Sequence, residues 1–413
     1  MELSNIVFTD QDDSVFSAGG ILNTGIANTL AGNDTIEVTN GWYGFENVGT
    51  LNTEDGNDII TAIGSIIGII TNYDSILDTG KGNDTIIGMS HNKGFVNRGT
   101  LNTSDGNDKI SGSGKEGVVN EGTLNTSDGN DEISGTALHK GFINRGVFNT
   151  DDGNDTIIGT ALETGIITDY GSTLDTGKGN DIITGIVSFG GDVSISNSGT
   201  INTGDDEDFI LSRGGTFINT GEVFLGEGKD SIIAVRKVIS FGLDSGLENF
   251  NFIGTGDGND TINSTGIIHN QGVIETGNGD DCIMVDIDTE GTDIKYGIHN
   301  NGGAINMGDG NDSIIANQGF ESGENSSGAW FLGEGDDYIK GFGSGDFYGG
   351  NGNDTLELTP GSYTVGIWGE AGESPIFTKG SQLMITSEFE KLKAGSTIYN
   401  FTSLTAGQII VVA

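Results

Sequence analysis

The chain has 413 residues, with 60 acidic and 17 basic side chains and a formal net charge of −43. This charge argues against nucleic acid or an anionic membrane surface as a partner, because both would repel the protein. The 73 glycines and the high charge are also found in disordered chains, but a hydrophobic fraction of 34% in regular short runs indicates an ordered fold. No apolar run approaches the ~18–20 residues needed to cross a bilayer.

The first residues, 1–28, are expected to form an N-terminal cap with one degenerate coil. The opening Met1–Asn5 lacks the basic and apolar regions of a cleaved secretory signal. Cys282 is the single cysteine, so no disulfide within the chain holds the fold.

One turn motif, Gly-Asn-Asp-x-Ile in its commonest form, recurs fourteen times within residues 29–358, at intervals of mostly about 24 residues. Repeats of this length form stacked units, none of which buries its apolar face alone. Stacking brings each motif aspartate next to the previous one, an arrangement that requires a cation between the carboxylates. The motif aspartates are Asp34, Asp58, Asp84, Asp108, Asp131, Asp155, Asp181, Asp208, Asp230, Asp260, Asp281, Asp312, Asp337 and Asp354.

Each repeat contains three short alternating segments separated by glycine or Asx corners, as in residues 94–112, which is typical of strands. With a rise of ~3.3 Å per residue, about 24 residues close one coil with three short sides. The pattern therefore predicts an all-β parallel β-solenoid (β-helix) of about 14 coils with a roughly triangular section. The residues expected to point inward in two consecutive coils, one per side, are Val96, Leu101, Ile110, Val119, Leu124 and Ile133.

An Asn-x-Gly corner lies eleven residues before the motif aspartate in nine coils. We expect these asparagines to form a ladder of amides that are hydrogen-bonded between coils, although they could instead bind a ligand. Length variation falls on the other arc of the coil, and the long segments 231–248 and 282–300 are where a specific activity would be expected. The nine asparagines are Asn23, Asn47, Asn97, Asn120, Asn144, Asn197, Asn219, Asn270 and Asn301.

The turn Thr-x-Asp-Gly-Asn-Asp offers the carboxylate and carbonyl oxygens that calcium prefers, and its glycine allows a left-handed conformation. Magnesium, which demands a small rigid octahedron, is less suited. The alternative is that Gly-Asn-Asp is merely a tight turn. Asp206 and Lys229 disturb two copies of the motif, so the Asp208 and Asp230 sites are expected to be weak. Many turns carry a second carboxylate three residues before the motif aspartate, including Glu227 and Glu334. Those also expected to bind calcium are Asp55, Asp105, Asp128, Asp152, Asp257 and Asp309.

The sequence resembles the RTX, or hemolysin-type, calcium-binding repeat family. Residues 349–357 match its pattern Gly-Gly-x-Gly-x-Asp-x-apolar-x at every fixed position, and most other copies keep the second half, as in residues 258–262. The family usually runs its nonapeptides in tandem and places calcium on two edges. Here one copy occurs per coil, so one metal edge is expected. The resemblance implies calcium binding and export by a type I system that reads an uncleaved C-terminal signal.

Both prolines, Pro360 and Pro375, follow the last motif, which places a boundary near residue 358. We expect residues 29–358 to form the calcium-binding solenoid and residues 359–413 to form a β cap that also carries the secretion signal. Strand-like segments in this tail are 362–368, 382–386, 396–401 and 408–412. Low cytosolic calcium would keep the chain unfolded for export, and calcium outside the cell would fold it.

The interpretation favoured by the sequence is a secreted, non-enzymatic structural or adhesive module of a bacterial surface or matrix, with calcium, cell-surface glycan or another copy end to end as partners. None of His91, His139, His269 and His299 has the spacing of a nucleophile or zinc site. One alternative is a polysaccharide lyase or epimerase, for which Arg213, Arg236, Lys237 and Lys295 are the candidate catalytic residues.

Another alternative is an outward face that binds ice or glycan. Thr100 with Asn102 and the equivalent residues of other coils would form regular rows on it. Ile76, Val147 and Glu222 interrupt the threonine row, and threonine also simply favours strands.

Overall fold

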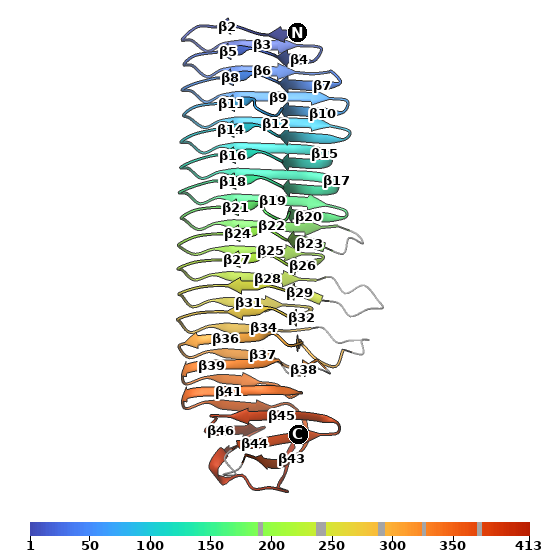
Figure 1. Ribbon diagram of the computed structural model, residues 1–413, viewed down its shortest axis with the longest axis vertical. Helices are drawn as coiled ribbons and strands as arrows, with labels where there is room; N and C mark the ends of the chain where they lie inside the picture. Colours follow the sequence, from blue (N-terminus) through green and yellow to red (C-terminus); the bar gives the residue numbers. More distant parts are fainter. Residues whose placement is uncertain (189–192, 237–244, 288–293, 324–327, 370–373) are drawn as a thin grey trace. The chain divides into compact units, whose positions relative to one another are not determined.

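The computed structural model describes residues 1–188, 193–236, 245–287, 294–323, 328–369 and 374–413. They form strands throughout, apart from one single-turn 3-10 helix, η1 (Phe401–Ser403). The chain divides into two compact units, Met1–Gly215 and Thr216–Ala413, each wound as a parallel β-solenoid (Figure 1). The predicted fold class is confirmed. Within the described ranges, no helix is long and apolar enough to span a membrane.

Each coil of the first unit has three sides, and the strands of each side pair in parallel with those of the next coil. The strands that follow the aspartate turn are β3 (Ser14–Ser17), β6 (Thr35–Val38), β9 (Ile59–Gly64), β12 (Thr85–Ser90), β15 (Lys109–Asn120), β17 (Glu132–Asn144), β19 (Thr156–Ala161), β22 (Ile182–Val187) and β25 (Phe209–Arg213). The second side comprises β1 (Glu2–Leu3), β4 (Ile21–Asn23), β7 (Tyr43–Asn47), β10 (Ile67–Thr71), β13 (Lys93–Asn97), the later halves of β15 and β17, β20 (Thr164–Thr168) and β23 (Val193–Asn197). The third side comprises β2 (Ile6–Val7), β5 (Ile26–Asn28), β8 (Thr50–Asn52), β11 (Ile76–Asp78), β14 (Thr100–Asn102), β16 (Thr123–Asn125), β18 (Val147–Asn149), β21 (Thr173–Asp175) and β24 (Thr200–Asn202).

The second unit repeats this plan. Its strands after the aspartate turn are β28 (Ser231–Val235), β31 (Thr261–Ser264), β34 (Cys282–Val285), β37 (Ser313–Ala316), β40 (Tyr338–Lys340), β42 (Thr355–Leu358) and β46 (Lys391–Ala394). Its second side comprises β26 (Thr216–Asn219), β29 (Ser245–Asn249), β32 (Ile267–Asn270), β35 (Ile298–Asn300) and β38 (Phe320–Ser322). Its third side comprises β27 (Glu222–Phe224), β30 (Phe252–Gly254), β33 (Val273–Glu275), β36 (Ala304–Asp309), β39 (Ala329–Gly335), β41 (Gly345–Gly352) and β45 (Gln382–Ser387).

The C-terminal residues add antiparallel strands to the second unit. They are β43 (Gly361–Trp368), β44 (Ser374–Lys379), β47 (Thr397–Asn400) and β48 (Ile409–Val412). The four strand-like segments predicted in this tail therefore all contain strands. The parallel stacking continues through β45 and β46, which pair with β41 and β42. The boundaries 1–28, 29–358 and 359–413 remain predictions.

The interior of each coil is a thin apolar stack. Leu101 and Ile110 are fully buried, as expected, and lie in register with Leu124 and Ile133. Val96 is buried too, but the inward orientation predicted for it is wrong. Its neighbour Asn97 donates inward to the third side of the coil, and adjacent residues of a strand point to opposite faces. Val96 and Val119 instead belong to a small separate cluster with Ile67, Ile70 and Ile143.

The asparagine ladder is confirmed with one correction. Asn97 donates to Asn120 Oδ1 over 2.9 Å, and Asn120 donates to Asn144 Oδ1 over 2.9 Å. In the second unit Asn270 donates to Asn300 Oδ1 over 3.0 Å, so Asn300 rather than Asn301 occupies the ladder, because that coil is one residue longer before its aspartate. Asn249 also belongs to the ladder, although its corner lacks the glycine.

The turn glycines allow the close approach of successive coils. Gly129 has φ +154°, and a Cβ there would lie 1.6 Å from the carbonyl oxygen of Gly106. Gly129→Ala should therefore destabilise the calcium-saturated protein by at least about 3 kcal/mol, because backbone atoms have to move. Gly19→Ala is the control, since a Cβ there meets nothing within 4 Å. Chemical denaturation measures both variants, and equal stability of the two would contradict the close stacking of the turns.

Candidate metal-binding row

The Gly-Asn-Asp turns join each third-side strand to the strand that follows, along the left edge of each unit in the view of Figure 1. The motif aspartates are buried there, with exposed fractions of 0–2%. In the first unit the buried row comprises Asp34, Asp58, Asp84, Asp108, Asp131, Asp155, Asp181 and Asp208. In the second unit it comprises Asp230, Asp260, Asp281, Asp312, Asp337 and Asp354. The sequence prediction that stacking aligns these residues is borne out within each unit.

One carboxylate oxygen of an aspartate in the row accepts a backbone N–H from the turn of the preceding coil. Asp58 Oδ1 accepts the N–H of Asp34 over 2.7 Å, and Asp84 Oδ1 accepts that of Asp58 over 2.8 Å. The same contact links Asp230 to Asp260 over 2.8 Å in the second unit. Each aspartate therefore holds the turn of the preceding coil, which fixes the orientation of its carboxylate.

Two residues at the ends of the row have no Gly-Asn-Asp signature. The N–H of Asp13 donates to Asp34 Oδ1 over 2.8 Å, so residues 10–13 occupy the place of a turn in the degenerate first coil. At the other end Asp354 N–H donates to Glu390 Oε2 over 2.7 Å. From the sequence, the position of Asp13 could have been predicted only by aligning Asp12-Asp13 with Asn33-Asp34.

The other carboxylate oxygen is buried and has no donor in good hydrogen-bond geometry among the described residues, although the hydroxyl of a buried threonine, such as Thr53 beside Asp58, lies close enough to lower the pKa of the carboxylate. This holds for Oδ2 of Asp34, Asp58, Asp84, Asp108, Asp131, Asp155, Asp181, Asp260, Asp281, Asp312, Asp337 and Asp354. A buried polar atom without a partner is costly, and a buried charge much more so. A repeated row of such oxygens fits a set of bound cations, which would supply the missing partner and neutralise the charge.

The pKa values of the row show the same electrostatic problem. Burial raises the pKa of Asp58, Asp131 and Asp337 to about 6 and that of Asp84 to about 7. Burial, with the neighbouring aspartates adding to it, raises the pKa of Asp108 and Asp155 to about 8. Without a cation, part of the row therefore holds protons at neutral pH.

The second carboxylates predicted as ligands lie in an outer row. Asp55, Asp105, Asp128, Asp152, Asp257 and Asp309 are exposed. Asp105 accepts from Lys81 Nζ over 2.5 Å and Asp257 accepts from Asn278 Nδ2 over 2.7 Å, while the charge of Asp257 helps to raise the pKa of Asp260. Among the described residues no group of three or more His, Cys, Asp or Glu side chains gathers at one point. A cation in the row would therefore rely on backbone carbonyls and water as well as carboxylates.

The motif asparagine has a role that its frequency in turns did not reveal. Asn33 Oδ1 accepts the N–H of Asn57 over 2.9 Å, and Asn57 Oδ1 accepts that of Asn83 over 2.7 Å. This exposed ladder fixes the turn in register beside the buried row. Gly-Asn-Asp is thus a stacking element in which two consecutive side chains bind neighbouring coils.

The two copies expected to be weak keep a buried aspartate, since Asp208 and Asp230 are both buried. The turn of Asp208 differs in its backbone, because Asp206, in place of the glycine, adopts φ +88°, whereas most of the motif glycines have φ between +126° and +159°. Left-handed residues also occur at Glu54, Ser104 and Ser127 near φ +60°, two positions before the motif glycine. Such strain is maintained where the surrounding structure requires it.

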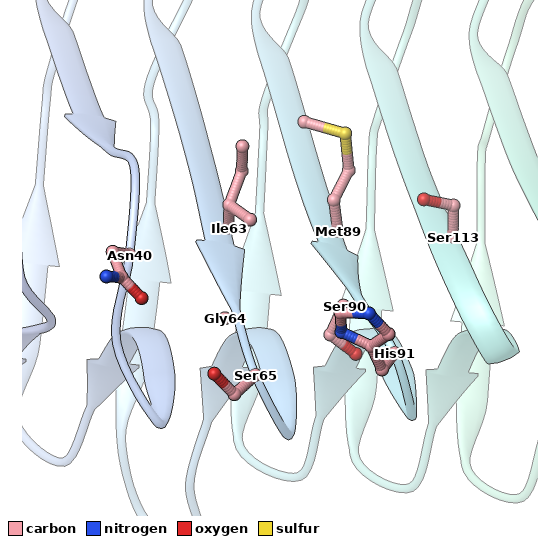
Figure 2. Close-up of a pocket in the computed structure, with 8 residues that line it drawn as sticks. All are labelled: Asn40, Ile63, Gly64, Ser65, Met89, Ser90, His91 and Ser113. Carbon is pink, nitrogen blue, oxygen red and sulfur yellow. The ribbon is translucent and has the colours of Figure 1, made fainter.

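The basic residues considered for catalysis include two whose surroundings the structure describes. Arg213 is exposed, whereas Arg236 Nη1 donates to Thr216 Oγ1 and to the carbonyl of Ser245. Lys237 lies outside the described residues, as do 237–244 and 288–293 of the two long segments. A surface hollow of about 340 Å³ on the first unit holds no acidic residue (Figure 2). It is lined by Asn40, Ile63, Gly64, Ser65, Met89, Ser90, His91 and Ser113.

No protein-family model and no curated protein sequence matches the chain. A solved structure with some similarity is a hyperactive, Ca2+-dependent, beta-helical antifreeze protein from an Antarctic bacterium. It is 18% identical, covers 96% of each chain and superposes with a TM-score of 0.46. Similarity of this degree assigns no residue role to the present protein.

Proposed function

We propose that the protein is a calcium-binding β-solenoid that folds when calcium fills its aspartate row. The observation that carries the proposal is the row of buried Oδ2 atoms, from Asp34 to Asp181 and from Asp260 to Asp354, with no donor in good hydrogen-bond geometry among the described residues. The Oδ1 atoms are already held by backbone N–H groups, so the carboxylates are oriented before any cation binds. A turn that binds no cation does not require a buried carboxylate, because a neutral residue would form the same turn.

The residues proposed to hold calcium are the buried motif aspartates, from Asp34 to Asp354, with carbonyl oxygens of the same turns. Calcium accepts six to eight oxygens in flexible geometry, which suits a site of few carboxylates and several carbonyls. Magnesium keeps its water and demands a rigid octahedron, so it should compete poorly. The exposed outer row, including Asp105 and Asp128, would raise the local negative potential and attract the cation.

Substitution of one inner aspartate tests the proposal. In chelator, Asp131→Asn should stabilise the protein by roughly 1–3 kcal/mol, because it removes a buried charge whose pKa is raised to about 6. In saturating calcium the same change should destabilise the protein and lower the bound calcium by about one ion per chain. The β signal that remains in chelator, thermal unfolding in calcium and metal analysis measure these effects.

Asp128→Asn is the matched control, since it removes the same charge from the exposed residue of the same turn. It should change the free energy of unfolding by no more than about 0.5 kcal/mol, both in chelator and in saturating calcium. Equal behaviour of the two variants would mean that the buried carboxylate has no special relation to calcium.

The biological role we propose is that of an exported structural or adhesive module. Calcium is scarce in the cytosol and abundant outside, so a calcium-dependent fold would form after export. Detection of the protein in the culture medium or on the cell surface, rather than in the cytosol, tests the location. Retention in the cytosol in a folded state would count against it.

A second candidate function is ice binding by the third side of the first unit. Thr100, Thr123, Thr173 and Thr200 lie in parallel rows with an Asx residue two positions later, and Asn125 Nδ2 donates to Asn102 Oδ1 over 3.3 Å. Ile76 and Val147 interrupt the threonine row but keep a β-branched side chain. A regular row of methyl and amide groups is the feature that favours this function.

Thermal hysteresis measured in saturating calcium tests the second candidate. Thr123→Tyr should remove the activity, whereas Thr136→Tyr on the exposed part of β17 should not. Absence of hysteresis in the wild-type protein would eliminate this candidate.

A further inference from the structure

The second side of the second unit carries a short polar column. Glu248, His269, His299 and Glu321 occupy equivalent positions of β29, β32, β35 and β38, each paired in register with the next. All four are partly exposed, and Glu248, His269 and His299 lie between buried neighbours. In the first unit the equivalent column is mostly apolar, with Ile70, Val96, Val119 and Ile143, although it also contains Glu46 and Ser196. The coil itself therefore does not require polar residues at this position.

The two histidines face each other closely. Nδ1 of His299 lies 3.0 Å from Nδ1 of His269, and the ring centroids are 5.0 Å apart at an interplanar angle of 69°. The ring of Tyr296 packs against that of His299, with centroids 5.2 Å apart, and shields one side of the pair. Parallel pairing of the two strands thus places the two imidazole rings on the same face of the sheet, with their Nδ1 atoms close together.

We propose that His269 and His299 form a binding site for a divalent transition metal of the copper or zinc type. Imidazole nitrogens bind such ions at about 2.0–2.1 Å, and two ligands at about 90–110° on one ion lie roughly 2.9–3.4 Å apart. The separation of 3.0 Å falls within this range. Glu248 and Glu321 flank the pair on the adjacent strands and provide the negative charge that a divalent ion needs nearby.

The protonation state of the pair suits a metal ligand. Burial lowers the pKa of His269, with the charge of His299 adding to the effect, and burial also lowers the pKa of His299. Both rings are therefore neutral at pH 7, which is the form that binds metals. A hydrogen bond between two neutral rings is the alternative explanation of the 3.0 Å contact.

This site would differ in kind from the aspartate row. Imidazole suits copper, nickel and zinc, whereas calcium prefers oxygen. In the part of the chain that the structure describes, no third carboxylate, histidine or cysteine joins the pair to form a larger cluster, so water would complete the coordination. Copper(II) should bind most tightly among the common divalent ions, following the usual order of affinities.

The experiment uses the full chain in saturating calcium, with Cu²⁺ as the probe and electron paramagnetic resonance as the readout. The wild-type protein should show one copper whose hyperfine structure reports two equivalent imidazole nitrogens. His269→Gln and His299→Gln should each weaken this binding at least about tenfold, by calorimetry at pH 7. His139→Gln is the control, because His139 lies in the first unit and pairs with Glu163.

Circular dichroism in calcium confirms that each variant is folded before copper is added. Unchanged affinity in either variant, or a wild-type spectrum with fewer than two coordinated nitrogens, would overturn the proposal and leave the pair as a hydrogen bond. Loss of copper binding in His139→Gln to the same extent would also overturn it. Calcium binding should be the same in all these variants, so the outcome is separate from that of the aspartate row.

Discussion

Removal of calcium by a chelator at pH 7.5 should unfold both units, with loss of the β signal in circular dichroism. Without calcium, the buried carboxylates of the row, from Asp34 to Asp354, must either stay charged or bind a proton. Either state lowers the free energy of unfolding. A site at tenfold excess of calcium over its dissociation constant contributes about 1.4 kcal/mol. A row of such sites is therefore comparable with the entire net stability of a typical domain, about 5–15 kcal/mol.

Addition of calcium should restore the β signal cooperatively, because each coil buries its apolar face only against its neighbours. Magnesium at the same concentration is the control and should leave the chain largely unfolded. A full β spectrum in chelator, with an unchanged melting temperature, would mean that the turns are stable without a cation.

The metal-free protein should be more stable at pH 5 than at pH 8, which is the second large effect. The pKa values of the row in the folded state, about 6 for Asp58 and Asp281, about 7 for Asp181 and Asp312 and about 8 for Asp155, lie above the unfolded value of about 3.9. Between these values the folded state binds more protons than the unfolded state. The free energy of unfolding therefore falls as the pH rises through this window.

The β signal in circular dichroism, recorded in chelator at a series of pH values, measures this effect. We expect a substantial β signal at pH 5 and little at pH 8, since many groups act together. Repulsion between exposed carboxylates has the same sign, but salt screens it. The difference should therefore persist in 0.5 M KCl, and its disappearance there would assign it to the surface charges. In saturating calcium the order should reverse, because protons compete with the cation.

The sequence predicted the coil because its two strongest signals are local. The spacing of Gly-Asn-Asp sets the period of the solenoid, and alternation around Leu101 and Ile110 shows which residues face the interior. Stacking of equal coils then places each aspartate beside the next without further information. The fold and the buried row were therefore within reach of sequence reasoning.

Other features depend on packing that the sequence does not show. Val96 lies beside Asn97, and only the inward hydrogen bond of Asn97 shows that Val96 points the other way. The outer position of Asp105 and Asp128 depends on the backbone path of the turn, since spacing alone does not distinguish a ligand from a surface carboxylate. His269 and His299 are thirty residues apart and meet because β32 and β35 pair in register despite the extra residues of that coil.

The number of calcium ions bound per chain, measured on the folded protein by native mass spectrometry, tests the central claim most directly. The structure predicts about one ion for each buried motif aspartate, lost progressively as chelator is added and together with the fold. A folded protein that carries fewer than about three calcium ions would contradict the claim and show that the aspartate row is stable without them.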